Sequence, residues 1–174
     1  MKYAVLYSSR TGNTQTVAEA IHAALPSGSA LLSVKDVSDA SDADVVFFGC
    51  WIDRGMADEA ARAALLDLEP KRIALFVTLG AYPFSLHALD SQRAVWAHAA
   101  ERHEVLGCFA CQGKVATSLT DRFNRFPAGH PHAMTPARLL RHKEAAGHPG
   151  DLDLRNAADY ARVISQYVVP GFVN

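Results

Sequence analysis

Hydroxyl, amide and glycine groups are concentrated in the run Ser8-Ser9-Arg10-Thr11-Gly12-Asn13-Thr14. The run follows residues 2–7, which are rich in strand formers, and precedes a stretch in which Val17 and Ile21 recur at helical spacing until Pro26. A strand, a tight loop and a helix N-terminus are therefore expected in succession. The first N–H groups of a helix have no partner within it and lie at the positive end of its dipole, so this loop could bind a phosphate. Because serine and threonine are also ordinary helix caps, a capping loop without a ligand is the alternative.

Apolar, strand-like runs alternate with helical patterns along the rest of the chain. The expected strands are residues 31–34, 43–49, 73–79 and 105–111, and further helices are expected to begin near Asp58, Leu86 and Asp151. Strands that are apolar at consecutive positions are typical of a parallel sheet covered by helices on both faces. The pattern predicts one α/β domain over residues 1–174, a doubly wound, five-stranded parallel sheet with the order 2-1-3-4-5.

Ligands of such sheets bind at the carboxyl ends of the strands, where the strand order reverses. This rule selects residues 8–14, the segment Cys50-Trp51-Ile52-Asp53-Arg54-Gly55, which we expect to be a loop, and the loop at residues 79–84. Two aromatic residues, Trp51 and Tyr82, lie in the second and third of these segments. Their planar side chains are suited to stacking on a flat heteroaromatic ligand.

The first loop resembles the FMN-phosphate loop of the flavodoxin family. The shared pattern is Ser-x-Thr-Gly-Asn-Thr at residues 9–14, and the order of elements is similar over nearly the whole chain. The resemblance implies a flavodoxin-like fold and FMN as the cofactor. The residues expected to bind it are Ser8, Ser9, Arg10, Thr11, Gly12, Asn13, Thr14, Cys50, Trp51, Ile52, Asp53, Arg54, Gly55, Leu79, Gly80, Ala81 and Tyr82.

The chain also departs from the best-known flavodoxins. Arg54 stands beside Asp53 in a segment that is usually more acidic, and the loop after the fourth predicted strand lacks their Gly-Asp-x-x-x-Tyr pattern. Negative charge near a flavin opposes its reduction, and Arg54 would partly offset that charge. A very low reduction potential is therefore not expected.

A long basic segment, residues 112–150, separates the fifth predicted strand from the last helix. Connections in such folds are usually about 2–6 residues long, so this segment is an insertion within the domain. It carries six basic residues against two acidic ones, whereas the rest of the chain has eleven basic and sixteen acidic residues. Two short helices are expected, one with Leu119, Phe123 and Phe126 on one face and one beginning at Thr135-Pro136. The segment is interpreted either as a solvated cover or as a basic platform for an acidic partner, a substrate or a nicotinamide phosphate. In the second case we expect Arg122, Arg125, Arg138 and Arg141 to steer an acidic partner or a carboxylate-bearing acceptor toward the flavin.

Other classes of site and partner are not favoured. No run approaches 18 consecutive apolar residues and a strand begins near the first residue, so we expect no membrane span, no signal peptide and a cytoplasmic protein. Near-neutral charge argues against nucleic acid. Cys50, Cys108 and Cys111 are expected to be buried thiols, with Cys108 and Cys111 on opposite faces of a strand. The histidines of the insertion are expected to be solvated, and no metal site is predicted.

Three functions fit these features. The first is an FMN-binding electron-transfer protein that shuttles electrons between a reductase and a partner enzyme. The second is an FMN-dependent NAD(P)H:quinone-type reductase, with the insertion forming part of its pocket. The third is a regulatory module that keeps the fold without the cofactor.

Overall fold

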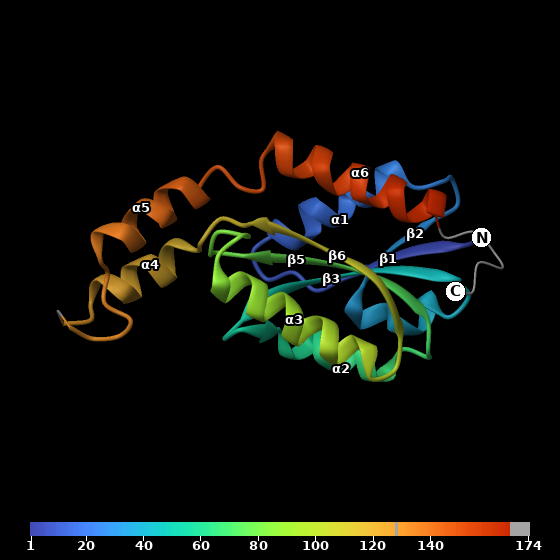
Figure 1. The fold of residues 1–174 in the computed structure, drawn as a ribbon, viewed down its shortest axis with the longest axis horizontal. Helices are drawn as coiled ribbons and strands as arrows, with labels where there is room; N and C mark the ends of the chain where they lie inside the picture. The colour runs from blue at the N-terminus through green and yellow to red at the C-terminus, as the bar shows by residue number, and fades with distance from the viewer. Residues whose placement is uncertain (128, 168–174) are drawn as a thin grey trace.

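A computed structural model describes residues 1–127 and 129–167 (Figure 1). Its central sheet contains five parallel strands in the order β2-β1-β3-β5-β6, so the predicted sheet and strand order are confirmed. The strands are β1 (Tyr3–Tyr7), β2 (Ala30–Ser33), β3 (Val45–Asp53), β5 (Arg72–Leu79) and β6 (Glu104–Gln112). A further short strand, β4 (Met56–Ala57), pairs antiparallel with β3.

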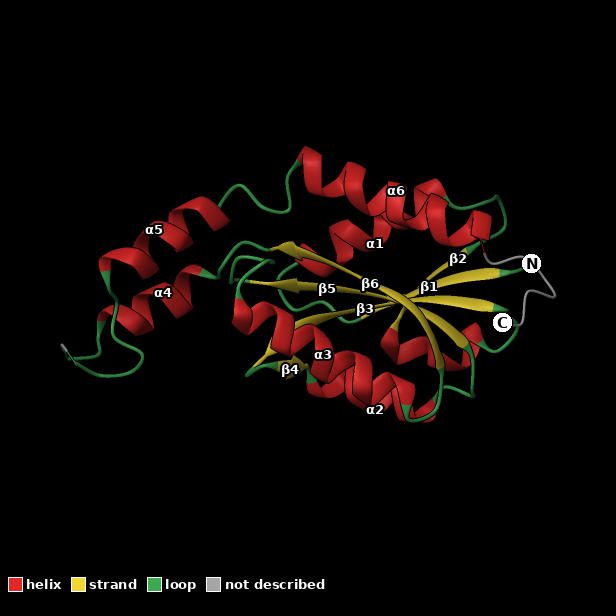
Figure 2. Ribbon diagram, viewed as in Figure 1, coloured by secondary structure: helices red, strands yellow, loops and turns green. Residues whose placement is uncertain are grey.

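Helices cover both faces of the sheet (Figure 2). One face carries α1 (Asn13–Ala24) and α6 (Asp151–Tyr167), and the other carries α2 (Glu59–Asp67), α3 (Leu86–Ala100) and the 3-10 helix η1 (Val34–Ala40). Neighbouring residues of β3 point into different cores, because Phe47 packs on the α1 side and Phe48 on the α2 side. This double burial explains why the strands are apolar at consecutive positions.

The third predicted strand is longer than expected. It was expected to end at Gly49, with residues 50–55 in a loop, but β3 continues to Asp53 and turns back into β4. Arg54 and Gly55 form the turn with positive φ angles of 51° and 83°, the backbone that a two-residue hairpin prefers. The segment is therefore a strand and a tight hairpin.

The insertion forms a helical hairpin of α4 (Thr117–Asn124) and α5 (Pro136–Ala145), so both expected helices are present. The hairpin projects beyond the edge of the sheet toward which β5 and β6 point (Figure 1). The expected apolar face of the first helix is wrong in part, because Leu119 is exposed and Phe126 lies beyond the end of α4. Within the described residues, no helix is long and apolar enough to cross a membrane.

The histidines of the hairpin are not all solvated. His142 is buried and shares a 2.9 Å hydrogen bond between its Nδ1 and Thr120 Oγ1, while His130 stacks on Phe126 with ring centroids 4.1 Å apart. Burial lowers the pKa of His142, and the nearby Arg141 adds to this effect. In the described part of the chain, no group of three or more His, Cys, Asp or Glu residues could hold a metal ion.

The three cysteines pack against apolar side chains. Cys108 faces the α2 side of the sheet and Cys111 the α1 side, so the prediction of opposite faces is confirmed. Burial raises the pKa of both thiols to about 12. Burial also raises the pKa of Cys50 well above its ordinary value. All three therefore remain protonated at neutral pH, which does not favour a redox role.

His103, which precedes β6, links α2 to the start of β5 at the end of the sheet opposite the insertion. Its Nδ1 accepts a hydrogen bond from the Lys71 backbone N–H at 3.2 Å, and its Nε2–H donates to the Leu65 carbonyl at 2.9 Å. The side chain is buried, and this burial lowers the pKa of His103 below its ordinary value of 6.5. Protonation would also remove the acceptor that Lys71 uses.

Replacing His103 should produce a pH-dependent loss of stability. His103→Ala leaves the buried Leu65 carbonyl, at roughly 1–3 kcal/mol, and the part-buried Lys71 N–H without their partner, and should lower the free energy of unfolding at pH 7.5. The folded state favours neutral His103, so this contribution is present above pH 6.5 and is lost as the pH falls through the lowered pKa. Urea denaturation of both proteins at pH 7.5 and pH 5.5 should show the difference between them shrinking at acid pH. The exposed His87→Ala serves as the control, and a pH-independent difference for His103→Ala would contradict the linkage.

Candidate cofactor site

The loop between β1 and α1 leaves a helix N-terminus open. Gly12 precedes α1 with a φ of 91°, which favours glycine, and neither a side-chain cap nor an acidic residue occupies the first turn. Among the described residues, no hydrogen bond uses the backbone N–H groups of residues 10–14. Three other helices, in contrast, are capped by Asp58, Ser85 and Thr135. The first turn of α1 therefore fits an external anion such as the phosphate of FMN.

Two buried side-chain pairs fix this loop and the first turn of α1 to β5 and to the N-terminus of α2. Ser8 Oγ donates to Asp58 Oδ1 at 2.7 Å, and Thr14 Oγ1 lies 2.9 Å from Thr78 Oγ1. Asp58 Oδ1 also accepts from the Ala61 backbone N–H at 3.2 Å, which caps α2. Because Ser8 gives its proton to Asp58, its hydroxyl anchors the loop and does not offer that proton to a ligand.

Three other side chains of the loop remain at its surface. Ser9 Oγ accepts from the Gln15 backbone N–H and Thr11 Oγ1 accepts from Asn13 Nδ2, both at 3.3 Å, so the protons of both hydroxyls stay available to an anion. Asn13 also donates to the Lys114 carbonyl at 2.9 Å. A Cβ at residue 113 would lie 2.8 Å from the Asn13 amide nitrogen, so Gly113 permits this approach.

Thr78 and Asp58 are the positioning residues that sequence reasoning missed. Asp58 was predicted only as the start of a helix, and Thr78 only as part of an apolar strand. A buried threonine or aspartate near a strand end is a signal for such a role, because a buried polar group needs a partner. Which residue provides the partner depends on the register of the sheet, where Thr78 lies opposite Trp51.

The two predicted aromatic residues lie at the carboxyl end of the sheet, Trp51 on β3 and Tyr82 in the loop after β5. Trp51 is half-buried, and the Arg10 guanidinium lies 5.5 Å from the centroid of its ring. Tyr82 stacks on Phe84 with a centroid distance of 5.7 Å and an interplanar angle of 13°, while its hydroxyl donates to Glu144 Oε2. This hydrogen bond raises the pKa of Tyr82. The structure thus presents one aromatic side chain on β3 and another in the loop that follows the neighbouring strand β5.

The remaining predicted residues differ in what they offer a ligand. Cys50 is buried in the α2-side core, so only its backbone is available, and Leu79 is also buried. Gly80 lies beside Val115, whose Cγ2 would be 2.8 Å from an added Cβ. The others lie on the hairpin of β3 and β4 or in the loop after β5: Ile52, Asp53, Arg54, Gly55 and Ala81.

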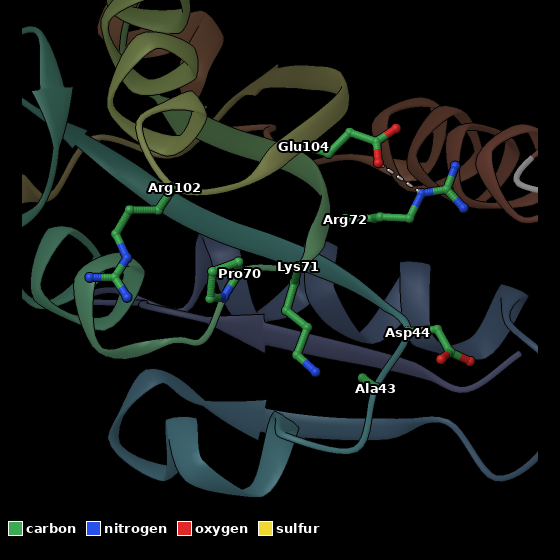
Figure 3. A pocket seen from close by; sticks show the side chains of 7 residues that line it. All are labelled: Ala43, Asp44, Pro70, Lys71, Arg72, Arg102 and Glu104. Atoms are coloured by element: carbon green, nitrogen blue, oxygen red, sulfur yellow. Dashed lines mark ion pairs between the residues drawn. The ribbon is translucent and has the colours of Figure 1, made fainter. Parts of the chain in front are cut away.

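A cavity of about 390 Å³ lies at the other end of the sheet, among residues that begin strands (Figure 3). Asp44, Arg72 and Glu104 line it, and Arg72 Nε lies 3.3 Å from Glu104 Oε2. Lys71 and Arg102 add two cations. Because ligands of parallel sheets bind at the carboxyl ends of strands, this cavity is not the predicted cofactor site.

The fold and the open helix N-terminus define an α/β protein with a candidate anion site at its strand-order switch point. Residues 4–162 match the family model described as a flavodoxin domain, and the chain therefore belongs to the flavodoxin domain family. This membership supports FMN as the cofactor, as the resemblance of the phosphate loop implies.

Relatives and solved structures agree with this assignment. The chain is 31% identical over 170 residues to the flavodoxin-like domain-containing protein BilS of Clostridioides difficile (strain CD3), covering 93% of this chain and 95% of BilS. It is 28% identical to BilS of Clostridium symbiosum (strain WAL-14163), and the match covers 88% of this chain and 90% of that protein. Oxidised Flavodoxin 2 from Bacillus cereus shares the fold, with a TM-score of 0.62 and 13% sequence identity. The superposition covers 95% of this chain and 99% of that flavodoxin.

FMN should bind this protein far more tightly than riboflavin does. Riboflavin lacks the phosphate, so it cannot use the open N–H groups of residues 10–14 or the hydroxyls of Ser9 and Thr11. Losing several hydrogen bonds to a charged group, each worth roughly 1.5–3 kcal/mol, should reduce affinity at least tenfold. Titration of the cofactor-free protein with each flavin, followed by flavin fluorescence, measures the ratio. Equal affinities would place the phosphate elsewhere.

Removing the indole of Trp51 should weaken FMN binding without abolishing it. Stacked aromatic pairs contribute roughly 0.5–1.5 kcal/mol beyond burial, so Trp51→Ala should raise the dissociation constant roughly 2- to 12-fold. Flavin fluorescence in the complex should rise because a quenching neighbour is lost. Trp96→Ala, on the outer side of α3, is the matched control and should change neither quantity. If Trp51→Ala behaves like that control, the isoalloxazine ring of FMN does not lie against Trp51.

Proposed function

We propose that this protein is a cytoplasmic, FMN-binding electron carrier that takes electrons from a reductase and passes them to a partner enzyme. The observation that carries the proposal is the open N-terminus of α1. This helix is held in place by buried hydrogen bonds, yet its first N–H groups are left for an anion. A regulatory module without the cofactor would have no need to keep this turn open.

The chain would supply binding and orientation, while FMN supplies one- or two-electron chemistry when bound. Residues 10–14 would hold the phosphate through backbone N–H groups, assisted by Ser9 and Thr11. Trp51 and Tyr82 would lie against the isoalloxazine ring. Asp53, the last residue of β3, and Arg54, in the turn after it, would add one charge of each sign near the ring and so moderate its reduction potential.

The basic hairpin supports transfer to a partner that carries negative charge. Arg122 and Arg125 are exposed, so they can steer an acidic surface toward the flavin over about a Debye length, 8 Å at physiological salt. Arg138, which was expected to share this role, is used within the hairpin. It donates to the carbonyls of Ala133 and Pro131 and lies over the ring of Phe123.

The second candidate is an FMN-dependent NAD(P)H:quinone-type reductase. The observation that favours it is the contact between Tyr82 and Glu144, because this contact brings α5 beside the expected ring site. A helix there could form one side of a substrate pocket.

Anaerobic mixing with NADPH distinguishes the two functions. The purified protein should be yellow, and its flavin absorbance should remain stable when NADPH is added alone, because a carrier receives electrons from a separate reductase. Adding a catalytic amount of an NADPH-dependent flavodoxin reductase should then bleach the absorbance. Direct bleaching by NADPH, at a rate that saturates with its concentration, would favour the quinone-type reductase. A colourless protein that binds no added FMN would contradict both.

A further inference from the structure

Arg141 of α5 is a half-buried cation whose guanidinium forms no ion pair with any described residue. Its Nε is inaccessible to solvent and has no hydrogen-bond partner in the described part of the chain, and no ion pair there includes Arg141. Burial lowers the pKa of Arg141, and the positive charge of Arg138 lowers it further. Holding a charge in such surroundings is costly unless an anion completes the site.

The acid that could pair with Arg141 within α5 is already engaged. Glu144 lies three residues after Arg141, a spacing that places two side chains on the same face of a helix. However, Glu144 Oε2 accepts the hydrogen bond of the Tyr82 hydroxyl. The hydrogen bond directs the Glu144 carboxylate to Tyr82, and among the described residues no ion pair joins Glu144 to Arg141.

The hydrogen bond between Tyr82 and Glu144 holds α5, the helix that carries Arg141, against the loop in which the ring site is expected. Tyr82 follows β5 at the carboxyl edge of the sheet, and its interaction with Arg141 is close enough to influence the pKa of Tyr82. Arg122 and Arg125 are instead exposed along α4 and after it. The insertion thus has outer cations that water surrounds and one recessed cation at the rim of the site.

We propose that Arg141 forms a subsite for a carboxylate group of the molecule that exchanges electrons with the flavin. A guanidinium matches a carboxylate through two parallel N–H···O hydrogen bonds, and a single unpaired guanidinium fits a single negative charge. The carboxylate belongs either to a small conjugated acceptor or to an Asp or Glu side chain of a partner protein. The inference rests on the proposed function, because Tyr82 is the residue that relates Arg141 to the flavin ring.

Calorimetric titration of the oxidised, FMN-loaded protein tests the subsite without electron transfer. The ligands are anthraquinone-2-carboxylate and its neutral carboxamide, two planar molecules that differ in the group offered to Arg141. Wild-type protein should prefer the carboxylate, and Arg141→Gln should reduce the ratio of affinities roughly tenfold, as expected for a charge-assisted, bidentate pair. Arg141→Lys keeps the charge without the planar fork and should give an intermediate ratio. Lys143→Gln removes one exposed charge from the same helix and should leave the ratio unchanged.

Tyr82→Phe provides a second, independent test. Without the hydroxyl, Glu144 is free to pair with Arg141, so the preference for the carboxylate should fall although Arg141 is intact. The double variant Tyr82→Phe/Glu144→Gln removes that competing acid and should restore the preference. A structural effect of losing the Tyr82 hydroxyl would not be reversed by the second substitution.

Titration with a hexaglutamate peptide identifies the source of the carboxylate. If Arg141→Gln weakens peptide binding more than Lys143→Gln does, while the anthraquinone ratio is unchanged, the subsite takes a partner's side chain. If Arg141→Gln alters neither ligand's binding beyond the Lys143→Gln control, the proposal is overturned. The flavin absorbance of each sample is recorded as well, so loss of FMN, which would contradict the proposed function, is distinguished from loss of the subsite.

Discussion

The site depends on one constraint: the first turn of α1 must be held rigidly while its N–H groups stay unpaired. A helix end without caps is unfavourable, and α2, α3 and α5 avoid it with a side-chain oxygen. Here the turn is fixed from below, by the hydroxyl pair of Thr14 and Thr78 and by the carbonyl of Gly49, which accepts the Ser8 N–H at 2.9 Å. None of these bonds uses the N–H groups that a phosphate would need. Rigidity and openness are thus provided by different atoms of the same loop.

Asp58 links the loop before the uncapped N-terminus of α1 to the capped N-terminus of α2. Its Oδ1 accepts from Ser8 and from the first turn of α2, so a buried carboxylate serves one helix N-terminus and anchors the loop that leads to the other. A carboxylate near a phosphate would ordinarily oppose its binding. Two hydrogen-bond donors on Oδ1 and the positive end of the α2 dipole stabilise the charge of Asp58, while Oδ2 is buried without a partner among the described residues. None of these interactions uses an N–H group of α1.

Local patterns and tertiary partners differ in how well they could be predicted. The strands and the candidate phosphate loop were predicted from local signals, namely consecutive apolar positions and a hydroxyl-rich turn before an amphipathic helix. The strand order was predicted from the doubly wound fold class that those strands indicate. The extension of β3 through Trp51 to Asp53 could not be predicted in this way, because those residues mix polarity and Arg54-Gly55 is a weak hairpin signal compared with Asn-Gly. The partners of Ser8, Thr14 and Tyr82 lie between 50 and 64 residues away along the chain. Such pairs are determined by sheet register and by the placement of the insertion, and no local pattern contains them.

The insertion shows why net charge is an incomplete guide to function. Its positive charge suggested one role for all of its arginines, but the structure separates them by environment. Arg138 is bonded to carbonyls of its own hairpin and stabilises it, so its charge contributes little to recognition beyond a local potential. Arg122 and Arg125 are surrounded by water, where their influence is long-ranged but weak and sensitive to salt. Arg141 is recessed, and the energy of an ion pair grows as the effective dielectric constant falls. The least exposed of these unpaired cations is thus the one from which a ligand would gain most, provided that Tyr82 keeps Glu144 away from it.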